Sequence, residues 1–497
     1  MMDSESLLQS AITSFKAKSA YVDGDRTVSY DDLAQLIGSP GFAAIDMAGA
    51  RVVVVLPDGA TAYLMHLVLY LKRAVHVPLS TKSSSERISS VVASVKPHFL
   101  VTTRALAARH ADVLSFQGKV IALDDGEPQA VMAGGALLSA LATASADICF
   151  NPATIRYIMF TSGSTGDPKG VCLSAANIMA AARMNVKALG LDSERRSVIG
   201  VPHFDYYGLI QIYSHAVAGA CIVYGGALMF PADIERRLGA GATDLVTVPF
   251  ALAHIVRQVR QHGLKSFGAL DVITSSSDIL TDHLLAEVFD LNPAVRIFDI
   301  YGLTEAGRAC FSEITRENFT ERSLGRPAEG VSIKLNGESS SEPTGEIIIA
   351  GPNVMVGYFR GLEGEHLLIK HFAEMRTGDL GARVDGGGVR LIGRIGHMIN
   401  IRGHKIHPIE IERIATSFGG VLEARASRYE IEGEAKIRLE LVVGDHDSFV
   451  EGELRQALQR GLPLAFMPAQ ITYHQALQRT EIGSKIMRQI KDGRYPR

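Results

Sequence analysis

Short apolar runs rich in β-branched residues recur along the first two thirds of this chain, with longer amphipathic segments between them. The clearest is "RVVVVLP" at residues 51–57. A continuous run of this kind is typical of a strand covered on both faces, as in a parallel sheet flanked by helices. Comparable runs follow at residues 76–80, 98–103, 119–123, 221–226, 245–249 and 270–277. The alternation predicts an α/β protein with largely parallel sheets.

The pattern changes after about residue 340. Segments 345–359 and 381–396 are typical of antiparallel strands, and segment 407–418 predicts a helix with Pro408 in its first turn. A chain of 497 residues also exceeds what one hydrophobic core usually supports. We therefore expect a large N-terminal domain over 1–395 and a small C-terminal domain over 396–497, with the hinge at Gly396.

Composition excludes several classes of protein. The formal net charge is -3 and charged residues make up 21%, which argues against a nucleic-acid or anionic-membrane surface. No apolar run reaches the roughly 18 residues that span a bilayer, and the first residues lack the basic flank of a signal peptide. The scattered cysteines favour a reducing compartment over a disulfide framework. We expect a cytoplasmic protein that binds neither nucleic acid nor membrane.

The stretch "YIMFTSGSTGDPKG" at 157–170 predicts a strand followed by a loop of small and hydroxyl residues. Consecutive small residues let backbone N–H groups converge on an anion, and a lysine adds a point charge. The pattern is not the common P-loop, because Pro168 stands where that motif needs its second glycine. A surface loop rich in turn formers is the alternative. The predicted phosphate-binding residues are Thr161, Ser162, Gly163, Ser164, Thr165, Gly166 and Lys169.

This stretch resembles the phosphate-binding signature of the acyl-adenylate-forming (AMP-forming) ligase superfamily, which includes acyl-CoA synthetases, luciferases and nonribosomal peptide synthetase adenylation domains. Four further segments are similar to motifs of that family in the same order: "LYLKRAVHVPLS", "IYGLTEAG", "RTGDLG" and "GRIGHMINIRGHKIHPIEIE". The chain looks closest to a stand-alone amino-acid adenylation enzyme. The resemblance implies a large domain of layered α/β sheets with a distorted β-barrel subdomain, and a small mobile α+β domain.

The resemblance also implies residue roles in nucleotide binding. Tyr301 would pack on adenine, and Thr304 and Glu305 would bind phosphate, with Glu305 holding Mg²⁺. Asp379 would accept hydrogen bonds from the ribose hydroxyls, and Arg394 would bind ribose or phosphate. The alternatives are a core tyrosine, a solvated glutamate at a helix start, a turn aspartate and a surface arginine.

Lys485 is the predicted catalytic lysine, because "TEIGSKIMR" resembles the family's C-terminal lysine segment. An ammonium group there would offset the repulsion between two reacting anions. Two departures stand in the same segment: Gln478 replaces a proline, and Ser484 lengthens the loop by one residue. A solvated lysine is the alternative.

The acid is predicted from "VPHFDYYGLIQ" at 201–211. Amino-acid-activating relatives carry an aspartate where this chain has Asp205, and it pairs with the substrate ammonium. The alternative is that Asp205 caps a helix beginning at Tyr206, since aspartate is a favoured N-cap. The predicted acid-binding residues are Asp205, Tyr206, Ser276 and Gly302.

The resemblance implies two half-reactions. A carboxylate reacts with Mg-ATP to give an acyl-adenylate and pyrophosphate, and a phosphopantetheine thiol then displaces AMP. We expect an α- or β-amino acid as substrate and a separate acyl or peptidyl carrier protein as acceptor. The alternatives are an acyl- or aryl-CoA ligase that uses free coenzyme A, and an inactive relative that only binds nucleotide.

Overall fold

The β-branched run at residues 51–55 forms β3 (Arg51–Val55), a strand buried along its whole length in this computed structural model. Its side chains alternate between two cores: Val52 and Val54 belong to one hydrophobic cluster, and Val53 and Val55 to another. The strand is therefore covered on both faces, as its composition predicts. The structure describes residues 3–111, 118–123, 140–141, 155–161, 169–226, 230–319, 323–338, 343–372, 374–384, 388–401, 404–431, 434–444 and 449–477.

β3 lies within an eight-stranded mixed sheet in which β4, β3, β5 and β6 are parallel. β7 extends this set, and β8, β18 and β19 add antiparallel strands at one edge. In order across the sheet, the strands are β19 (His366–Lys370), β18 (Gly357–Glu363), β8 (Lys169–Ser174), β7 (Ile155–Thr161), β4 (Val75–Pro78), β3, β5 (Phe99–Thr103) and β6 (Lys119–Leu123).

A nine-stranded sheet forms the second large layer, with a parallel centre and antiparallel edges. An antiparallel hairpin near the N-terminus, β1 and β2, forms one edge. In order, the strands are β15 (Arg326–Pro327), β14 (Gly307–Ile314), β13 (Arg296–Leu303), β12 (Val272–Ser276), β11 (Asp244–Thr247), β9 (Arg196–Ile199), β10 (Cys221–Tyr224), β1 (Ser19–Asp23) and β2 (Arg26–Ser29).

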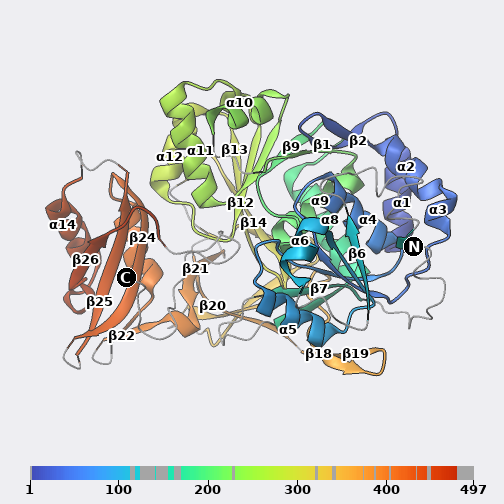
Figure 1. The fold of residues 1–497 in the computed structure, drawn as a ribbon. Helices are drawn as coiled ribbons and strands as arrows, with labels where there is room; N and C mark the ends of the chain where they lie inside the picture. The colour runs from blue at the N-terminus through green and yellow to red at the C-terminus, as the bar shows by residue number, and fades with distance from the viewer. Residues whose placement is uncertain are drawn as a thin grey trace.

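Helices separate and cover the two sheets (Figure 1). Between them lie α4 (Ala60–Leu71), α8 (Ala175–Leu189) and α9 (Tyr206–Ala218), whose side chains share one cluster with residues of both sheets. The outer face of the nine-stranded sheet packs against α10 (Pro231–Gly239), α11 (Pro249–His262) and α12 (Asp282–Leu291). The eight-stranded sheet packs against α5 (Ser85–Val95) on its outer face. The remaining helices of this part are α1 (Ser4–Ser14), α2 (Tyr30–Gly38), α3 (Pro40–Ala43) and α6 (Arg104–Arg109).

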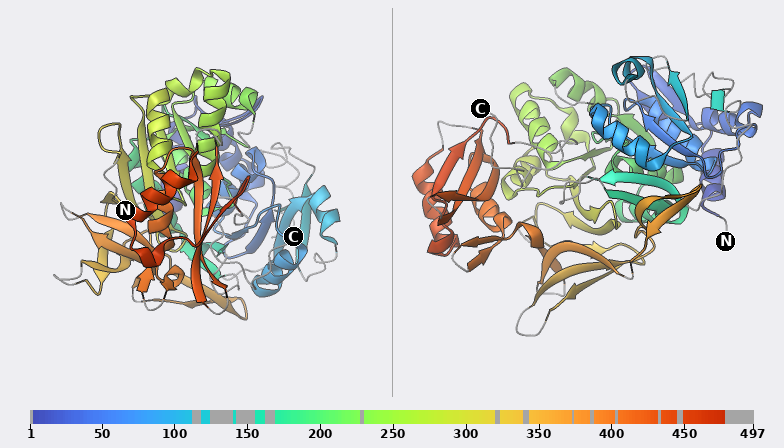
Figure 2. Two further views of the ribbon diagram at one scale, coloured as in Figure 1. Left: turned by 90° about the vertical axis from the view of Figure 1, so that its left-hand side faces the viewer. Right: turned by 60° about the horizontal axis from the view of Figure 1, so that its bottom comes forward.

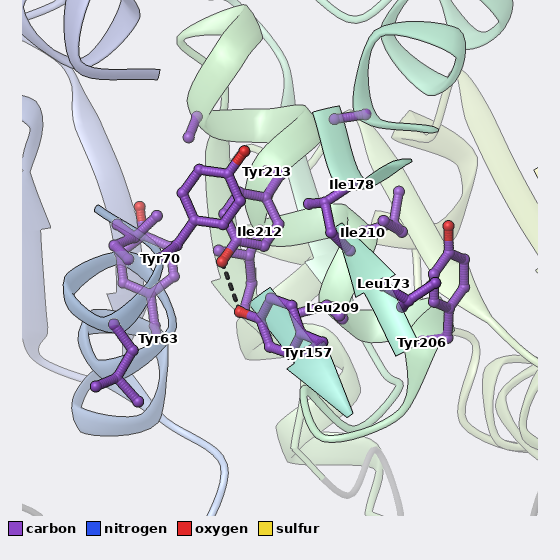
Figure 3. Close-up of a cluster of buried hydrophobic side chains, with 14 of the residues drawn as sticks. Tyr63, Tyr70, Tyr157, Leu173, Ile178, Tyr206, Leu209, Ile210, Ile212 and Tyr213 are labelled. Carbon is purple, nitrogen blue, oxygen red and sulfur yellow. Dashed lines mark hydrogen bonds between the residues drawn. The ribbon is translucent and has the colours of Figure 1, made fainter. Parts of the chain in front are cut away.

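Tyrosines join the sheets to the helices between them (Figure 3). The hydroxyl groups of Tyr157 on β7 and Tyr213 on α9 are 2.6 Å apart, and Tyr157 also lies 3.0 Å from Nδ1 of His66 on α4. These groups are buried, so each hydroxyl needs a partner inside the protein. The network fixes α9, and hence its N-terminal end, relative to β7.

A third sheet and a C-terminal unit complete the described chain. The third sheet is antiparallel and contains β16 (Ser332–Asn336), β17 (Thr344–Ala350), β20 (Met375–Arg383) and β21 (Val389–Arg394). The C-terminal unit, on the left in Figure 1 and also shown in Figure 2, has its own hydrophobic cluster. Its elements are β22 (Ile399–Ile401), β23 (His404–Ile406), α13 (Pro408–Thr416), β24 (Val421–Ile431), β25 (Glu434–Val443), α14 (Glu451–Gly461) and β26 (Gln470–Tyr473).

The α/β class predicted from the sequence is confirmed, with large layered sheets and a smaller α+β unit. The cluster of the C-terminal unit contains only residues from 399 onward. This agrees with a boundary at 395/396, which stays a prediction. Among the described residues, no helix is long and apolar enough to cross a bilayer.

Candidate nucleotide and acid cleft

A cleft of about 2870 Å³ opens at the carboxyl ends of β7, β12 and β13 and extends to the third sheet and to α13. Open α/β sheets bind their ligands at such strand ends. Every predicted site residue that the structure describes lines this one cleft: Thr161, Lys169, Asp205, Tyr206, Ser276, Tyr301, Gly302, Thr304, Glu305, Asp379 and Arg394. The other predicted residues lie outside the described part of the chain: Ser162, Gly163, Ser164, Thr165, Gly166 and Lys485.

The two ends of the predicted phosphate-binding stretch lie opposite each other. β7 ends at Thr161 and β8 begins at Lys169, and these two residues are partners across the antiparallel pair. The Lys169 Nζ lies 5.7 Å from the centroid of the Tyr358 ring. The Tyr358 hydroxyl in turn donates to Glu305 Oε1 at 2.9 Å. A cation and a carboxylate are therefore gathered around one aromatic ring at this end of the cleft.

The hairpin of β13 and β14 carries the segment "YGLTEAGR". β13 continues through Leu303, so Glu305 lies in the tight turn between the strands and not at a helix start. Gly302 faces the returning strand so closely that a Cβ there would lie 2.0 Å from the Gly307 carbonyl oxygen. Gly307 itself has φ +57°, a conformation that favours glycine. Both glycines are thus required by the hairpin.

Asp379 is buried on β20 and receives two side-chain hydrogen bonds. Tyr301 donates its hydroxyl to Oδ2 at 2.9 Å, and Arg394 donates Nε to Oδ1 at 2.8 Å. Burial, and then the charge of Asp379, raise the pKa of Tyr301 well above its ordinary value. Burial alone would lower the pKa of Arg394, but Asp379 raises it above the usual range. The three side chains form a paired group, and Asp379 is not a plain turn aspartate.

Asp205 is the N-cap of α9 and also lines the cleft. Its Oδ1 accepts the Tyr206 backbone N–H at 2.8 Å. The helix thus begins where the capping interpretation predicts. A carboxylate has about four lone-pair sites, so one cap bond does not by itself occupy the group. Capping and recognition of a ligand are therefore compatible.

Ser276 ends β12 and donates its hydroxyl to the Ile300 carbonyl at 2.7 Å. The next residue, Ser277, has φ +81°, which is uncommon for any residue other than glycine. This conformation gives a physical reason why glycine would be favoured at such a position. Strain of this kind persists only where the surrounding structure imposes it.

Arg308 is a cleft residue that the sequence analysis missed. It is 3% exposed, and its guanidinium lies 4.6 Å from the centroid of the Tyr207 ring. Nη2 donates to the Tyr207 carbonyl at 3.2 Å, whereas Nε and Nη1 have no hydrogen-bond partner among the described residues. Burial lowers the pKa of Arg308, and Tyr207, Tyr206 and Asp205 oppose that shift. The available signal was a lone arginine within the small apolar run "AGRAC".

A layered α/β fold with a cleft at the ends of its strands, and a small C-terminal unit beside that cleft, is typical of an enzyme that binds a nucleotide. The model of the AMP-binding enzyme family matches residues 8–359, and the chain belongs to that family. It is an AMP-forming acid–thiol ligase; the family uses ATP, acts on carboxylic acids and transfers them to coenzyme A or to carrier proteins.

Individual relatives are distant but cover nearly the whole chain. Novobiocin biosynthesis protein H of Streptomyces niveus is 26% identical over 96% of this chain and 80% of its own length. The isonitrile lipopeptide synthase of Streptomyces coeruleorubidus is 27% identical over 92% of this chain, which spans 31% of that synthase. The structure of o-succinylbenzoate CoA synthetase from Bacillus subtilis, in complex with its acyl-adenylate, gives a TM-score of 0.76 at 22% identity and covers 98% of both chains. This last likeness shows the fold.

Proposed function

We propose that this protein adenylates an amino acid and transfers it to the phosphopantetheine thiol of a separate carrier protein. One observation carries the proposal: eleven residues assigned to the nucleotide or the acid, from six separate segments, line a single cleft. Segments far apart in the sequence converge in this way when they serve one site. Membership of the AMP-binding enzyme family supports the first half-reaction.

In the first half-reaction, an oxygen of the substrate carboxylate attacks the α-phosphorus of ATP. A bond forms between them, the bond to the β-phosphate oxygen breaks, and pyrophosphate leaves. The physical difficulty is that one anion attacks another, so positioning and positive charge dominate. We assign charge compensation to Lys169 and Lys485, and phosphate binding to Thr161, Thr304 and the stretch that follows Thr161.

The nucleoside is assigned to Tyr301, Asp379 and Arg394. A half-buried aromatic ring suits the flat face of adenine, and a buried carboxylate suits two ribose hydroxyls. Asp379 already accepts two hydrogen bonds from its neighbours, so its oxygens point toward donors in the cleft. Ribose binding would replace or share these bonds.

The residues present fit a Mg²⁺ ion bound together with triphosphate. Glu305 supplies a carboxylate in the cleft, beside Lys169 and Tyr358. Among the described residues no group of three or more acidic, histidine or cysteine side chains is placed to hold a metal. Phosphate oxygens and water would therefore provide most ligands, as is usual for Mg²⁺. The bound ion supplies charge neutralisation between the phosphates and the carboxylate.

In the second half-reaction, the acceptor sulfur attacks the acyl carbon and forms the thioester. The bond to AMP breaks, AMP leaves, and the thiol proton passes to solvent. Rotation of the unit beginning near Gly396 would withdraw Lys485 and admit the thiol arm. A Cβ placed on Gly396 would meet no atom of the described residues within 4 Å.

A pyrophosphate-exchange screen over amino, fatty and aromatic acids tests the proposal. We expect ATP-dependent exchange with amino acids, and thioester formation on a phosphopantetheinylated carrier in preference to free coenzyme A. The Lys485→Ala variant should lose most adenylation. Exchange with no acid would instead indicate a nucleotide-binding relative, and efficient use of coenzyme A would indicate an acyl- or aryl-CoA ligase.

The ammonium role of Asp205 has its own matched variant. Asparagine is as good an N-cap as aspartate, so Asp205→Asn keeps the start of α9 while removing the charge. We expect it to lose the preference for amino acids over the corresponding simple acids. If that preference survives, Asp205 is only the cap of the helix.

A further inference from the structure

The charge of Arg308 is buried at the acid end of the cleft, which is the part lined by Asp205, Tyr206 and Arg308. Its side chain is almost completely buried, and two of its three nitrogen atoms lack a hydrogen-bond partner among the described residues. Burying a charge is strongly unfavourable, and each unpaired donor adds a desolvation cost. The charge of Asp205 offsets only part of this cost, because burial still lowers the pKa of Arg308. The hydrogen bond to the Tyr207 carbonyl engages Nη2 and brings no negative charge.

A second unpartnered donor lies beside it. The Tyr206 hydroxyl is buried and has no hydrogen-bond partner among the described residues. It reaches to the backbone next to Arg308, since a Cβ on Gly307 would lie 2.6 Å from its oxygen. Tyr206 and Arg308 also influence each other through charge, and both line the cleft. Figure 3 shows Tyr206 at the edge of the tyrosine-rich core, away from the Tyr157–Tyr213 pair.

Together, a guanidinium with two open N–H directions and a phenol hydroxyl make a receptor for an oxyanion. A carboxylate matches the planar fork of arginine and brings a negative charge into hydrogen-bond contact with it. An uncharged polar group would satisfy the hydrogen bonds but would leave the guanidinium to share the charge of Asp205 with the substrate ammonium. The chemistry of the donors therefore selects an anionic group on the ligand.

We propose that the acid activated here carries a second carboxylate, which Arg308 and Tyr206 bind while Asp205 receives the ammonium group. The substrate class is then the amino dicarboxylic acids, of which aspartate and glutamate are the simplest. This inference rests on the proposed function and specifies its substrate. Asp205 and Tyr206 are consecutive residues at the start of α9 and both line the cleft, so we expect the ammonium and the second carboxylate to lie close together on the substrate.

The test compares matched acids in pyrophosphate exchange with the full-length protein. One series is aspartate, asparagine and 2-aminobutyrate, and the other is glutamate, glutamine and norvaline. In at least one series, we expect kcat/KM for the dicarboxylic acid to exceed that of its amide and alkyl analogues by about a hundredfold or more. A site with buried polar donors rejects ligands that leave those donors unpaired.

Two arginine variants localise the effect. Arg308→Met, with a flexible apolar side chain of similar reach, should bring the dicarboxylic preference close to one, and Arg308→Lys should keep part of it. Arg326 also lines the cleft but is exposed, so Arg326→Met is the matched control and should leave the preference unchanged. The wild-type series needs no variant, so it decides the matter even if Arg308→Met does not fold.

The outcomes separate this inference from the function on which it rests. Exchange that is equally fast with the amide and alkyl analogues overturns the inference and leaves amino-acid adenylation standing. Calorimetric binding of a dicarboxylic amino acid that requires Arg308, without any exchange, supports the inference and overturns adenylation. If neither binding nor exchange depends on the second carboxylate in either series, the assignment of Arg308 as the residue that binds it is wrong.

Discussion

The two ends of the cleft differ in how their polar groups are satisfied. At the nucleotide end, Tyr301 and Arg394 both donate to Asp379, and Tyr358 donates to Glu305. At the acid end, Arg308 Nε and Nη1 and the Tyr206 hydroxyl have no partner among the described residues. One end is held together by its own contacts, whereas the other presents donors that these contacts leave unsatisfied.

This difference teaches how each end gains affinity. A ligand that enters a paired group exchanges one hydrogen bond for another, so the net gain per bond is modest. A ligand that satisfies buried, unpaired donors removes a standing penalty, and a ligand that fails to do so is rejected strongly. We expect the nucleotide end to provide robust binding of ATP and the acid end to provide selectivity.

The largest expected effect follows from removing Asp379, the shared hydrogen-bond acceptor at the nucleotide end of the cleft. Asp379→Ala deletes the acceptor of two hydrogen bonds and leaves Arg394 without its partner. We expect KM for ATP in the exchange assay to rise by about a hundredfold, since hydrogen bonds to a charged group contribute about 1.5–3 kcal/mol each. KM for the acid should change far less. Equal changes in both KM values would show that the two ends are not separate.

The two ends of the cleft are best compared at a pH at which titration of Asp244, outside the cleft, does not change the stability of the protein. Burial raises the pKa of Asp244, away from the cleft on β11, from 3.8 to about 6. Between these pH values the folded state binds the Asp244 proton more tightly than the unfolded state does. The stabilising contribution of this proton to the free energy of unfolding is therefore fully present below pH 4 and is lost as the pH rises through 6. The loss is on the order of 3 kcal/mol, at about 1.4 kcal/mol per pKa unit.

Urea unfolding of wild type and Asp244→Asn across this range measures the effect. The variant should lack the fall in unfolding free energy between pH 4 and 6 that Asp244 causes in the wild type. Parallel pH profiles for the two proteins would contradict the assignment. Experiments that compare the two ends of the cleft belong at pH 7 or above, where this group no longer changes.

Removing this buried guanidinium should stabilise the free protein. Arg308→Met takes away a charged group whose Nε and Nη1 have no hydrogen-bond partner among the described residues, and a buried donor left unsatisfied costs about 1–3 kcal/mol. We expect the free energy of unfolding to rise by about 2 kcal/mol in the absence of acid. Arg394→Met, at the paired end, should lower it, because Asp379 then loses its partner. If Arg308→Met is as destabilising as Arg394→Met, the ends do not differ in the proposed way.

A single oxygen atom gives the finest comparison. Tyr301→Phe removes a hydroxyl that donates to Asp379, whereas Tyr206→Phe removes one that has no partner in the described part of the chain. We expect the first variant to lose about 1 kcal/mol of stability, the usual net value of a hydrogen bond, and the second to lose almost none. Thermal unfolding of both variants without ligand tests this. A larger loss in Tyr206→Phe would mean that its hydroxyl already has a partner.

Much of the fold could be predicted from the sequence because its signals are local. β-branched runs specify β3 and its neighbours, and Pro408 specifies the start of α13. The cleft residues were found because family motifs surround them. Their convergence depends on sheet order, which local signals do not contain.

Arg308 could not be predicted as a cleft residue. Its burial arises from the hairpin pairing of β14 with β13 and from the approach of α9, and this second contact is distant in sequence. Asp205 was undecided between two roles for a similar reason, because the N-cap bond and exposure to the cleft are separate consequences of where α9 lies. Glu305 was considered at a helix start, whereas β13 extends far enough to place it in a hairpin turn.

The hairpin of β13 and β14 carries residues of both the nucleotide end and the acid end of the cleft. Tyr301 and Glu305 lie on its first strand and turn, and Arg308 follows after the tight return at Gly307. The distance along the chain is so short that the backbone cannot shift at one position without moving the others. Substitutions at position 308 that are selected for a different substrate acid should therefore alter the apparent affinity for ATP as well. We expect the affinity for ATP to be restored by compensating substitutions on α9, outside the hairpin.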